Sequence, residues 1–335
     1  MAVPFGLDGT YWLLPLVAGS VTDICEKAGS TLMAKSVFTL ADGERVVTET
    51  EQEREQKQLE SATTKAFVDS VKEDLLANNI YLPTLPALAL EALIIINDAD
   101  SSATDLQKVI SRDAALTARL IRYANSPLYR GMNKIATIKP AITRIGFQRV
   151  KNAVYAVSMK EVFRTSVKVI ERRMDKLWSH SVKVGAQAAM LAKSQPGLDP
   201  DVALVAGLVH DIGHIPLLIK ACKYKELIDN PNLLDKVLRK LHCHIGSSIL
   251  KLWKFDESIV EVAAQHEDFS RDPSDDVAVD YVDIVQVANI LAHEGTDHYL
   301  AEVDRSTIKA FARLEHGEHG GDLDADTKQV EDAIF

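Results

Sequence analysis

The sequence has few of the features that mark secreted or membrane proteins. Its three cysteines, Cys25, Cys222 and Cys243, are odd in number and follow no metal-binding or redox spacing, as is typical of proteins in the reducing cytoplasm. The apolar stretch at residues 11–19 is too short to cross a bilayer, and no Lys or Arg precedes Lys27. We therefore expect a cytoplasmic protein without a signal peptide or membrane anchor.

Positive charge is also scarce. The chain has 38 basic and 48 acidic side chains and a net charge of −10, which disfavours an extended surface for nucleic acid or anionic membranes. Hydrophobic residues make up 47% of its 335 residues, enough for a substantial core. This length allows two modest domains or one large one.

The first 60 residues differ in composition from the rest. Segments 35–40 and 45–48 are rich in Val, Thr and Phe, and Asp42-Gly43 between them is a strong turn signal, so we predict a small β-hairpin. The charged run at 49–60 is typical of a solvated helix or a linker, with an exposed helical face as the simplest interpretation. We assign residues 1–60 to an N-terminal extension.

From residue 82 onward the apolar residues recur at helical spacing. Residues 104–107 have the form of a capping box, Asp113 precedes another helix, Pro140 suits a first helical position and Gly146 an end. Short turns without strand alternation predict an all-α protein of two packed helical bundles. The tail carries His316 and His319, which we interpret as part of a polar end rather than a metal site. The predicted segments are a first helical subdomain at 61–165, a second at 166–300 and a C-terminal helix or tail at 301–335.

The most informative stretch is the segment at residues 204–211. It is apolar on every side until it ends in His210 and Asp211. A helix that is hydrophobic all round belongs in a core. An ionisable pair at its end needs a metal or a hydrogen-bond network to satisfy it there.

Polar side chains on other segments also face inward. His180 lies three residues after Leu177 and four before Val184, which places it on an apolar helical face. One inward histidine is more often a satisfied core residue, but an unsatisfied buried polar group costs roughly 1–3 kcal/mol. Five such segments are better explained by one shared polar centre than by five separate hydrogen-bond networks. The predicted metal-ligating centre comprises His180, His210, Asp211, His242, His266 and Asn289.

The order of these residues resembles the H…HD…D pattern of the HD superfamily. Residues 113–126, DAALTARLIRYANS, resemble the DPxLxxxLLxxxNS stretch of HDOD domains, and residues 138–146, IKPAITRIG, resemble their SIxxAIxxLG stretch. The resemblance covers about residues 80–295. Further matching segments are 178–181, 207–213, 242–246 and 252–253.

This resemblance implies an all-helical fold and a bacterial signalling or regulatory context. HDOD domains are similar to HD and HD-GYP hydrolases but are usually regarded as lacking part of the catalytic set. The present sequence departs from the hydrolase pattern in three places. Asn289 stands where hydrolases carry the closing aspartate, His214 replaces the lysine of HDxGK, and residues 265–268 lack a following Gly-Tyr-Pro.

These departures have chemical consequences for metal binding. A two-metal hydrolase needs anionic ligands that hold two dications within about 4 Å. Asp211 is the one clear carboxylate of the predicted centre, with Glu267 as an addition, and Asn289 carries no charge. A mostly histidine site suits one transition-metal ion, such as Fe, Ni, Zn or Mn, rather than a magnesium pair. Asp211 is the candidate catalytic residue if the centre hydrolyses anything.

The leading hypothesis is a cytoplasmic signalling module that recruits a protein partner and keeps the HD centre as a structural, ligand-sensing or metal-sensing core. The alternative is a metal-dependent phosphohydrolase acting on a nucleotide or cyclic dinucleotide. A third hypothesis, nucleic-acid binding through Arg119, Arg122 and Arg130, is disfavoured because the net charge is negative.

Overall fold

The computed structural model describes residues 51–77, 84, 87–98, 100–129, 131, 133–147, 149–274, 277–314 and 323–334. Within these ranges every regular element is a helix, which confirms the predicted all-α fold. The hairpin predicted at residues 35–48 lies outside the described residues.

The chain divides into two compact units. Unit 1 contains residues 1–81 and 220–240, and unit 2 contains residues 82–219 and 241–335. The borders placed after residues 60, 165 and 300 from the sequence stay a prediction.

Unit 1 is built on α2 (Glu51–Leu76), which includes most of the charged run at 49–60. Phe67 of α2 is fully buried and meets Tyr224 edge to face, with ring centroids 5.3 Å apart. Lys220 pairs with Asp74. Val71 and Leu75 of α2 are buried as well. Buried apolar side chains and a few polar contacts therefore hold α2 near the segment that leads into α11 (Lys225–Asp229).

Unit 2 begins with five helices whose ends follow local sequence signals. Asp113 accepts hydrogen bonds from the backbone N–H groups of Ala115 and Leu116, so it is an N-cap as predicted. The capping box lies earlier than predicted, at Ser102 and Asp105, because the serine hydroxyl reaches the first turn. These helices are α3 (Ala87–Asn97), α4 (Ala103–Ile110), α5 (Ala114–Ala124), α6 (Ile138–Ile145) and α7 (Val150–Val162).

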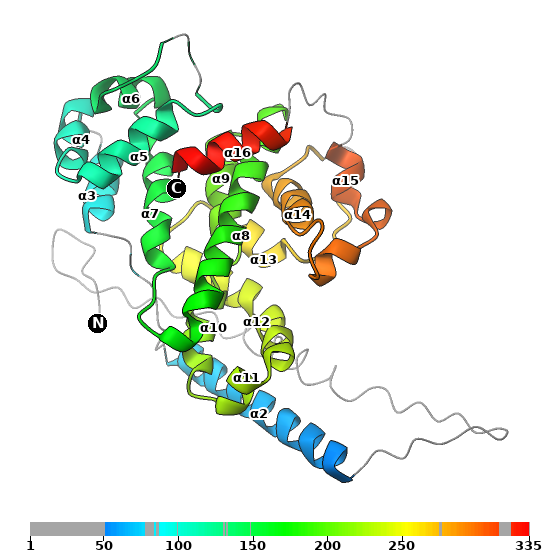
Figure 1. The fold of residues 1–335 in the computed structure, drawn as a ribbon. Coiled ribbons are helices and arrows are strands. Elements are labelled where there is room, and N and C mark those ends of the chain that lie inside the picture. Colours follow the sequence, from blue (N-terminus) through cyan, green and yellow to red (C-terminus); the bar gives the residue numbers. More distant parts are fainter. Residues whose placement is uncertain are drawn as a thin grey trace. The chain divides into compact units, whose positions relative to one another are not determined.

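Pro140 is the third residue of α6 rather than its first, since the helix begins at Ile138 after an extended Thr137. Helix α7 joins the first helices to the rest of unit 2, because it packs against α3, α5 and α9 (Figure 1). The remaining helices include those that carry the candidate site. They are α8 (Lys168–Lys193), α9 (Pro200–Val209), α10 (His214–Ala221), α12 (Pro231–Leu252), α13 (Glu257–Gln265), α14 (Tyr281–Ala292), α15 (Lys309–Leu314) and α16 (Leu323–Ile334), with short 3-10 turns η2 (Tyr299–Glu302) and η3 (Arg305–Thr307).

Helices α8 and α9 form the centre of unit 2. A Cβ on Gly207 of α9 would lie 2.7 Å from the Cα of Gly185 on α8, so the two backbones touch where only glycine fits. The interval Pro200–Ala221 has the length and hydropathy of a membrane span, but 78% of it is buried inside the protein. Together with the ionisable pair at His210 and Asp211, this burial identifies it as core.

A second buried polar group lies where α5 and α9 approach. The carboxylate of Asp201 is 2% exposed and accepts hydrogen bonds from the hydroxyls of Tyr123 and Tyr129. Burial raises the pKa of Asp201, although both hydroxyls oppose the rise. Because the two donors satisfy the carboxylate, this group has a structural explanation and needs no metal.

Candidate metal centre

The HD turn connects α9 to α10 and is pressed against α12. His210 ends α9, and Gly213 sits directly on the α12 backbone, where an added Cβ would lie 2.6 Å from Gly246 N and 2.8 Å from His242 C. The absence of a side chain at Gly213 therefore lets Asp211 approach His242. Tertiary packing, not local sequence, sets this distance.

Three side chains form one half of the centre. His180 Nε2 of α8 lies 3.3 Å from His210 Nε2. The Asp211 Oδ2 atom is 3.3 Å from His210 Nε2 and 3.8 Å from His180 Nε2. Donor atoms this close form a group that could hold a metal ion.

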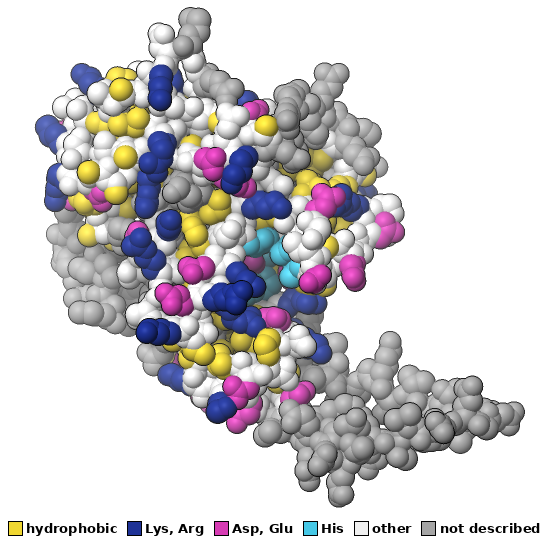
Figure 2. Space-filling model, in the orientation of Figure 1, with side chains coloured by type: hydrophobic (Ala, Val, Ile, Leu, Met, Phe, Trp, Pro, Cys, Tyr) yellow, Lys and Arg dark blue, Asp and Glu magenta, His cyan; other side chains and the backbone are white. Residues whose placement is uncertain are grey.

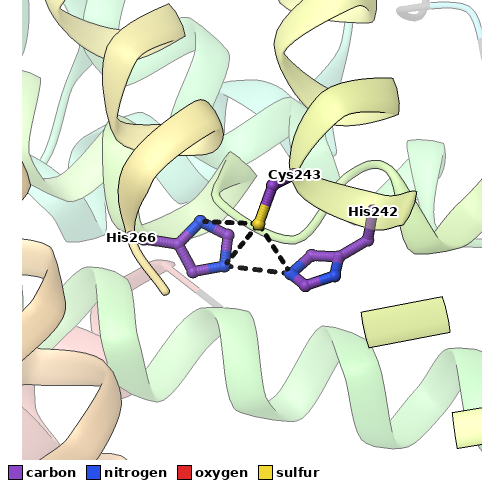
Figure 3. Close-up of side chains that lie close together, drawn as sticks. All are labelled: His242, Cys243 and His266. Atoms are coloured by element: carbon purple, nitrogen blue, oxygen red, sulfur yellow. Dashed lines mark hydrogen bonds between the residues drawn. The ribbon is translucent and has the colours of Figure 1, made fainter. Parts of the chain in front are cut away.

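The other half uses the second oxygen of the same carboxylate. Asp211 Oδ1 lies 3.3 Å from both His242 Nε2 of α12 and His266 Nε2 at the end of α13. These two imidazole nitrogens are 3.1 Å apart. Cys243 completes this half, with Sγ 3.3 Å from His242 Nε2 and 4.0 Å from His266 Nε2 (Figure 3). The carboxylate of Asp211 is therefore shared by two groups of donors.

Backbone carbonyls orient two of the rings. His210 Nδ1 lies 2.7 Å from Gly207 O, and His266 Nδ1 lies 3.2 Å from Val262 O. A carbonyl only accepts, so each Nδ1 carries a proton, and in the neutral form of each ring Nε2 presents its lone pair to the centre. This arrangement fixes the tautomer that a metal-ligating histidine needs.

The centre is buried, and its electrostatics follow from that burial. His210 and His266 are 0% exposed and Asp211 is 8% exposed. Burial would raise the pKa of Asp211, but the neighbouring His210 and His214 hold it well below its ordinary value, so the carboxylate is ionised at neutral pH. Burial lowers the pKa of His180, and it lowers the pKa of His214 to about 4.

The two rings beside Cys243 shift the other way. Burial would lower the pKa of His242, but the adjacent thiolate of Cys243 and the carboxylate of Asp211 raise it to about 9. The pKa of His266 is raised for the same reasons. Burial opposes ionisation of Cys243, yet the two histidines lower its thiol pKa to about 7. The surroundings of these rings therefore favour positive charge.

Asn289 is a buried residue of α14, and no hydrogen bond among the described residues joins its Oδ1 atom to the other predicted ligands. It is 2% exposed, and its Oδ1 atom has no hydrogen-bond partner within the described part of the chain. Four residues later His293 stacks on His180, with ring centroids 4.4 Å apart. Residues spaced by four share a helical face, so Asn289 lies on the face of α14 that meets α8.

The structure adds residues that the sequence did not single out. His298 stacks on His293, with ring centroids 3.7 Å apart, and Tyr299 donates a hydrogen bond of 2.6 Å to Glu267 Oε1. Glu267 Oε2 lies 4.0 Å from His242 Nε2, at the edge of the centre. Figure 2 shows histidine side chains at the surface near acidic and basic ones.

Cys243 and His214 were also missed as site residues. The cysteine follows no Cys-to-Cys spacing because its partners are histidines on its own helix and on α13. The sequence pattern identifies His214 only as the residue that stands in place of a lysine, yet its ring centroid lies 4.3 Å from that of His242. The adjacency of His242 and Cys243 was the one signal available in the sequence.

Comparison with known proteins agrees with this architecture. The chain is 27% identical to a crystal structure from Shewanella amazonensis SB2B, provisionally named a metal-dependent phosphohydrolase; the match covers 82% of this chain and all of that one, with a TM-score of 0.71. An HDOD domain protein of unknown function from Geobacter sulfurreducens is 21% identical, with 83% and 98% coverage and a TM-score of 0.52, and so shares the fold.

An uncharacterized protein of Treponema pallidum (strain Nichols) is 27% identical over 209 residues, which are 58% of this chain and 39% of that protein. The present chain therefore matches less than half the length of this relative. The HDOD domain model matches residues 82–269, more than half of the chain and nearly all of the helices that carry the centre. The chain belongs to the HDOD domain family.

Proposed function

We propose that this chain is a cytoplasmic regulatory module of bacterial signalling, whose centre holds one transition-metal ion and hydrolyses phosphoesters poorly or not at all. The observation that carries the proposal is the sharing of a single carboxylate, Asp211, by both groups of donors. In this proposal the helical surface recruits a protein partner, and the centre serves as a structural or sensing core.

The residues present fit a transition metal. The donors are mainly imidazole Nε2 atoms that lie 3.1–3.3 Å apart in pairs, and imidazole suits Zn, Fe, Ni and Cu. The buried Oδ1 atom of Asn289, which has no hydrogen-bond partner among the described residues, is a further polar atom that a ligand could satisfy. A bound ion with an open coordination position would act there as a Lewis acid towards an oxygen-containing ligand.

The same residues are poorly suited to a metal pair. Two dications about 4 Å apart repel each other by roughly 17 kcal/mol at an effective dielectric constant near 20. Hydrolases offset this repulsion with several carboxylates. Here Asp211 is the one carboxylate within the close donor groups of the described residues, and Asn289 is neutral. Glu267 is held at the edge by Tyr299.

The alternative function is metal-dependent hydrolysis of a nucleotide or cyclic dinucleotide. It is favoured by the 27% identity to the Shewanella protein and that protein's provisional name. The retained His210-Asp211 pair is also consistent with it. The neutral Asn289 and the lack of Gly-Tyr-Pro after Asp268 weigh against it.

Turnover assays test the proposal. Purified protein is supplied in turn with Mn, Fe, Ni and Zn and incubated with cyclic dinucleotides and nucleoside monophosphates; we expect negligible hydrolysis. Robust hydrolysis that His210→Ala abolishes, with the fold intact by circular dichroism, would favour the enzyme instead.

A second variant tests the role of the neutral amide. Asn289→Asp adds a second carboxylate, so we expect it to raise the affinity for metal. The proposal does not require this variant to gain hydrolytic activity. Unchanged affinity in a folded variant would place Asn289 outside the metal site.

A further inference from the structure

The half of the centre on α12 and α13 has the composition and geometry of a separate type of metal site. We propose that Cys243 supplies a thiolate ligand which, with Asp211, His242 and His266, forms a tetrahedral site for one Zn²⁺-class ion. This inference deepens the proposed function, because it rests on the centre holding a metal. It assigns the ion to one half of the centre and names its class.

Five of the six distances between the four donor atoms can be compared with the edges of a tetrahedron. A tetrahedral ion with Zn–N and Zn–O bonds near 2.0–2.1 Å has edges of roughly 3.3–3.4 Å, and an edge from nitrogen to a sulfur bound at 2.3 Å is roughly 3.6 Å. The three edges that join Asp211 Oδ1, His242 Nε2 and His266 Nε2 measure 3.3, 3.3 and 3.1 Å. Two of the three edges from Cys243 Sγ, those to His242 Nε2 and His266 Nε2, measure 3.3 and 4.0 Å and bracket the expected value.

The formal charges also balance. A thiolate and a carboxylate together carry two negative charges, which neutralise one dication in a buried place where an unpaired charge is costly. Cys243 is half-buried, and His242 and His266 are 1% and 0% exposed. The half formed by His180, His210 and Asp211 Oδ2 has no thiolate. Charge and donor number therefore favour the cysteine-containing half.

The donor set defines which ions bind. Thiolate and imidazole ligands select Zn and other softer transition metals, whereas Mg and Mn favour carboxylate, carbonyl and water oxygens. Four protein ligands fill a tetrahedral site in the manner of structural zinc, which leaves no open position for a reactive water. This property is consistent with a centre that stabilises or senses rather than hydrolyses.

The position of Cys243 is fixed by secondary structure on both sides. It follows His242 directly on α12, and Figure 3 shows its sulfur between the His242 ring and the His266 ring from the neighbouring helix α13. The His266 ring is held in place by its 3.2 Å contact with Val262 O. Helices α12 and α13 therefore position three of the donors, and the short HD turn positions Asp211, which limits the reorganisation needed to bind an ion.

Cobalt binding tests the thiolate directly. The full-length, tag-free protein is stripped with a chelator and titrated with Co²⁺, and absorption is recorded in the near-ultraviolet and the visible range. We expect a thiolate-to-cobalt charge-transfer band and intense visible bands typical of four-coordinate Co²⁺. Cys243→Ser should lose the charge-transfer band, while Cys222→Ser, the matched control at a cysteine outside the centre, should keep it.

Affinity and local structure supply independent measurements. In competition with a chromophoric chelator, Cys243→Ser should weaken Zn²⁺ binding by at least about 10-fold, because losing even a residue that only supports a metal ligand costs about that much. The same variant should leave Mn²⁺ binding nearly unchanged. X-ray absorption of the wild-type zinc form should show one sulfur near 2.3 Å. The X-ray absorption measurement needs no variant, so it can still overturn the inference if Cys243→Ser does not fold.

The outcomes separate the two proposals. Cobalt or zinc binding without a charge-transfer band and without a sulfur neighbour overturns the thiolate assignment and leaves the metal centre standing. A band that persists in Cys243→Ser also overturns the assignment. Wild-type protein that binds neither ion overturns both the inference and the metal part of the proposed function.

Discussion

Replacing Gly213 by alanine should separate the HD turn from α12 and disrupt the candidate centre. The added Cβ would lie 2.6 Å from Gly246 N, 2.8 Å from His242 C and closer still to the carbonyl oxygen of His242. Ordinary contacts of a Cβ begin near 3.4 Å, so the two backbones must move apart by about 1 Å. Backbone atoms in a helix cannot turn aside as a flexible side chain does.

The size of the effect follows from overpacking. Inserting extra carbon into a packed core costs typically about 1–3 kcal/mol and occasionally more. We expect the upper end, about 3 kcal/mol, for Gly213→Ala, because its neighbours are backbone atoms. Asp211 Oδ1 now lies 3.3 Å from His242 Nε2, and a shift of about 1 Å in that distance would remove the tetrahedral geometry of the donors.

Urea-induced unfolding and zinc affinity measure the two consequences. Gly246→Ala is the matched control, since its Cβ would have Gly213 N at 3.3 Å as its nearest neighbour and alanine favours the helix by roughly 0.5–1 kcal/mol. The control should stay within about 1 kcal/mol of wild type and keep its metal. The reasoning is refuted if Gly213→Ala matches the control in both stability and zinc affinity.

Two further substitutions test buried charges elsewhere in unit 2. Tyr123→Phe removes a donor to Asp201 and should cost roughly 1–3 kcal/mol near neutral pH. Burial raises the folded-state pKa of Asp201 above its unfolded value of 3.8, so the free energy of unfolding falls as pH rises between these two pKa values, and loss of the Tyr123 donor steepens the fall. In urea unfolding, Tyr123→Phe should therefore destabilise the protein less near pH 4 than near pH 7. Equal destabilisation at the two pH values would contradict the argument. Arg271 and Arg313 lie 2.9 and 3.1 Å from the carboxylate of Asp283. Asp283→Ala removes this partner from both guanidinium groups and should lower the free energy of unfolding, measured by calorimetry, by roughly 3 kcal/mol. A decrease below about 1 kcal/mol would show that water replaces the carboxylate.

Much of the fold and of the centre could be predicted because helical periodicity is a local property. The spacing of His180 between Leu177 and Val184 gives its inward phase without knowledge of the partner helix. The same reasoning applies to His242 and His266. The structure brings their Nε2 atoms to within hydrogen-bond distance of Asp211 or one another.

The missed residues depend on tertiary structure. Cys243 is about 100° around α12 from His242, so its direction alone does not place it in the centre; the position of His266 at the end of α13 does. His298 lies in a segment before η2 that has no helical period, and it stacks on His293 through tertiary structure. The capping box was misplaced because Ser102 and Thr104 offer similar signals two residues apart.

Metal analysis of untagged protein, purified without chelators, tests the central claim most directly. The account predicts close to one zinc-class ion per chain, retained through gel filtration and lost in a folded Asp211→Ala variant, because that carboxylate contacts both groups of donors. Protein that carries no transition metal and gains none after incubation with zinc would contradict it.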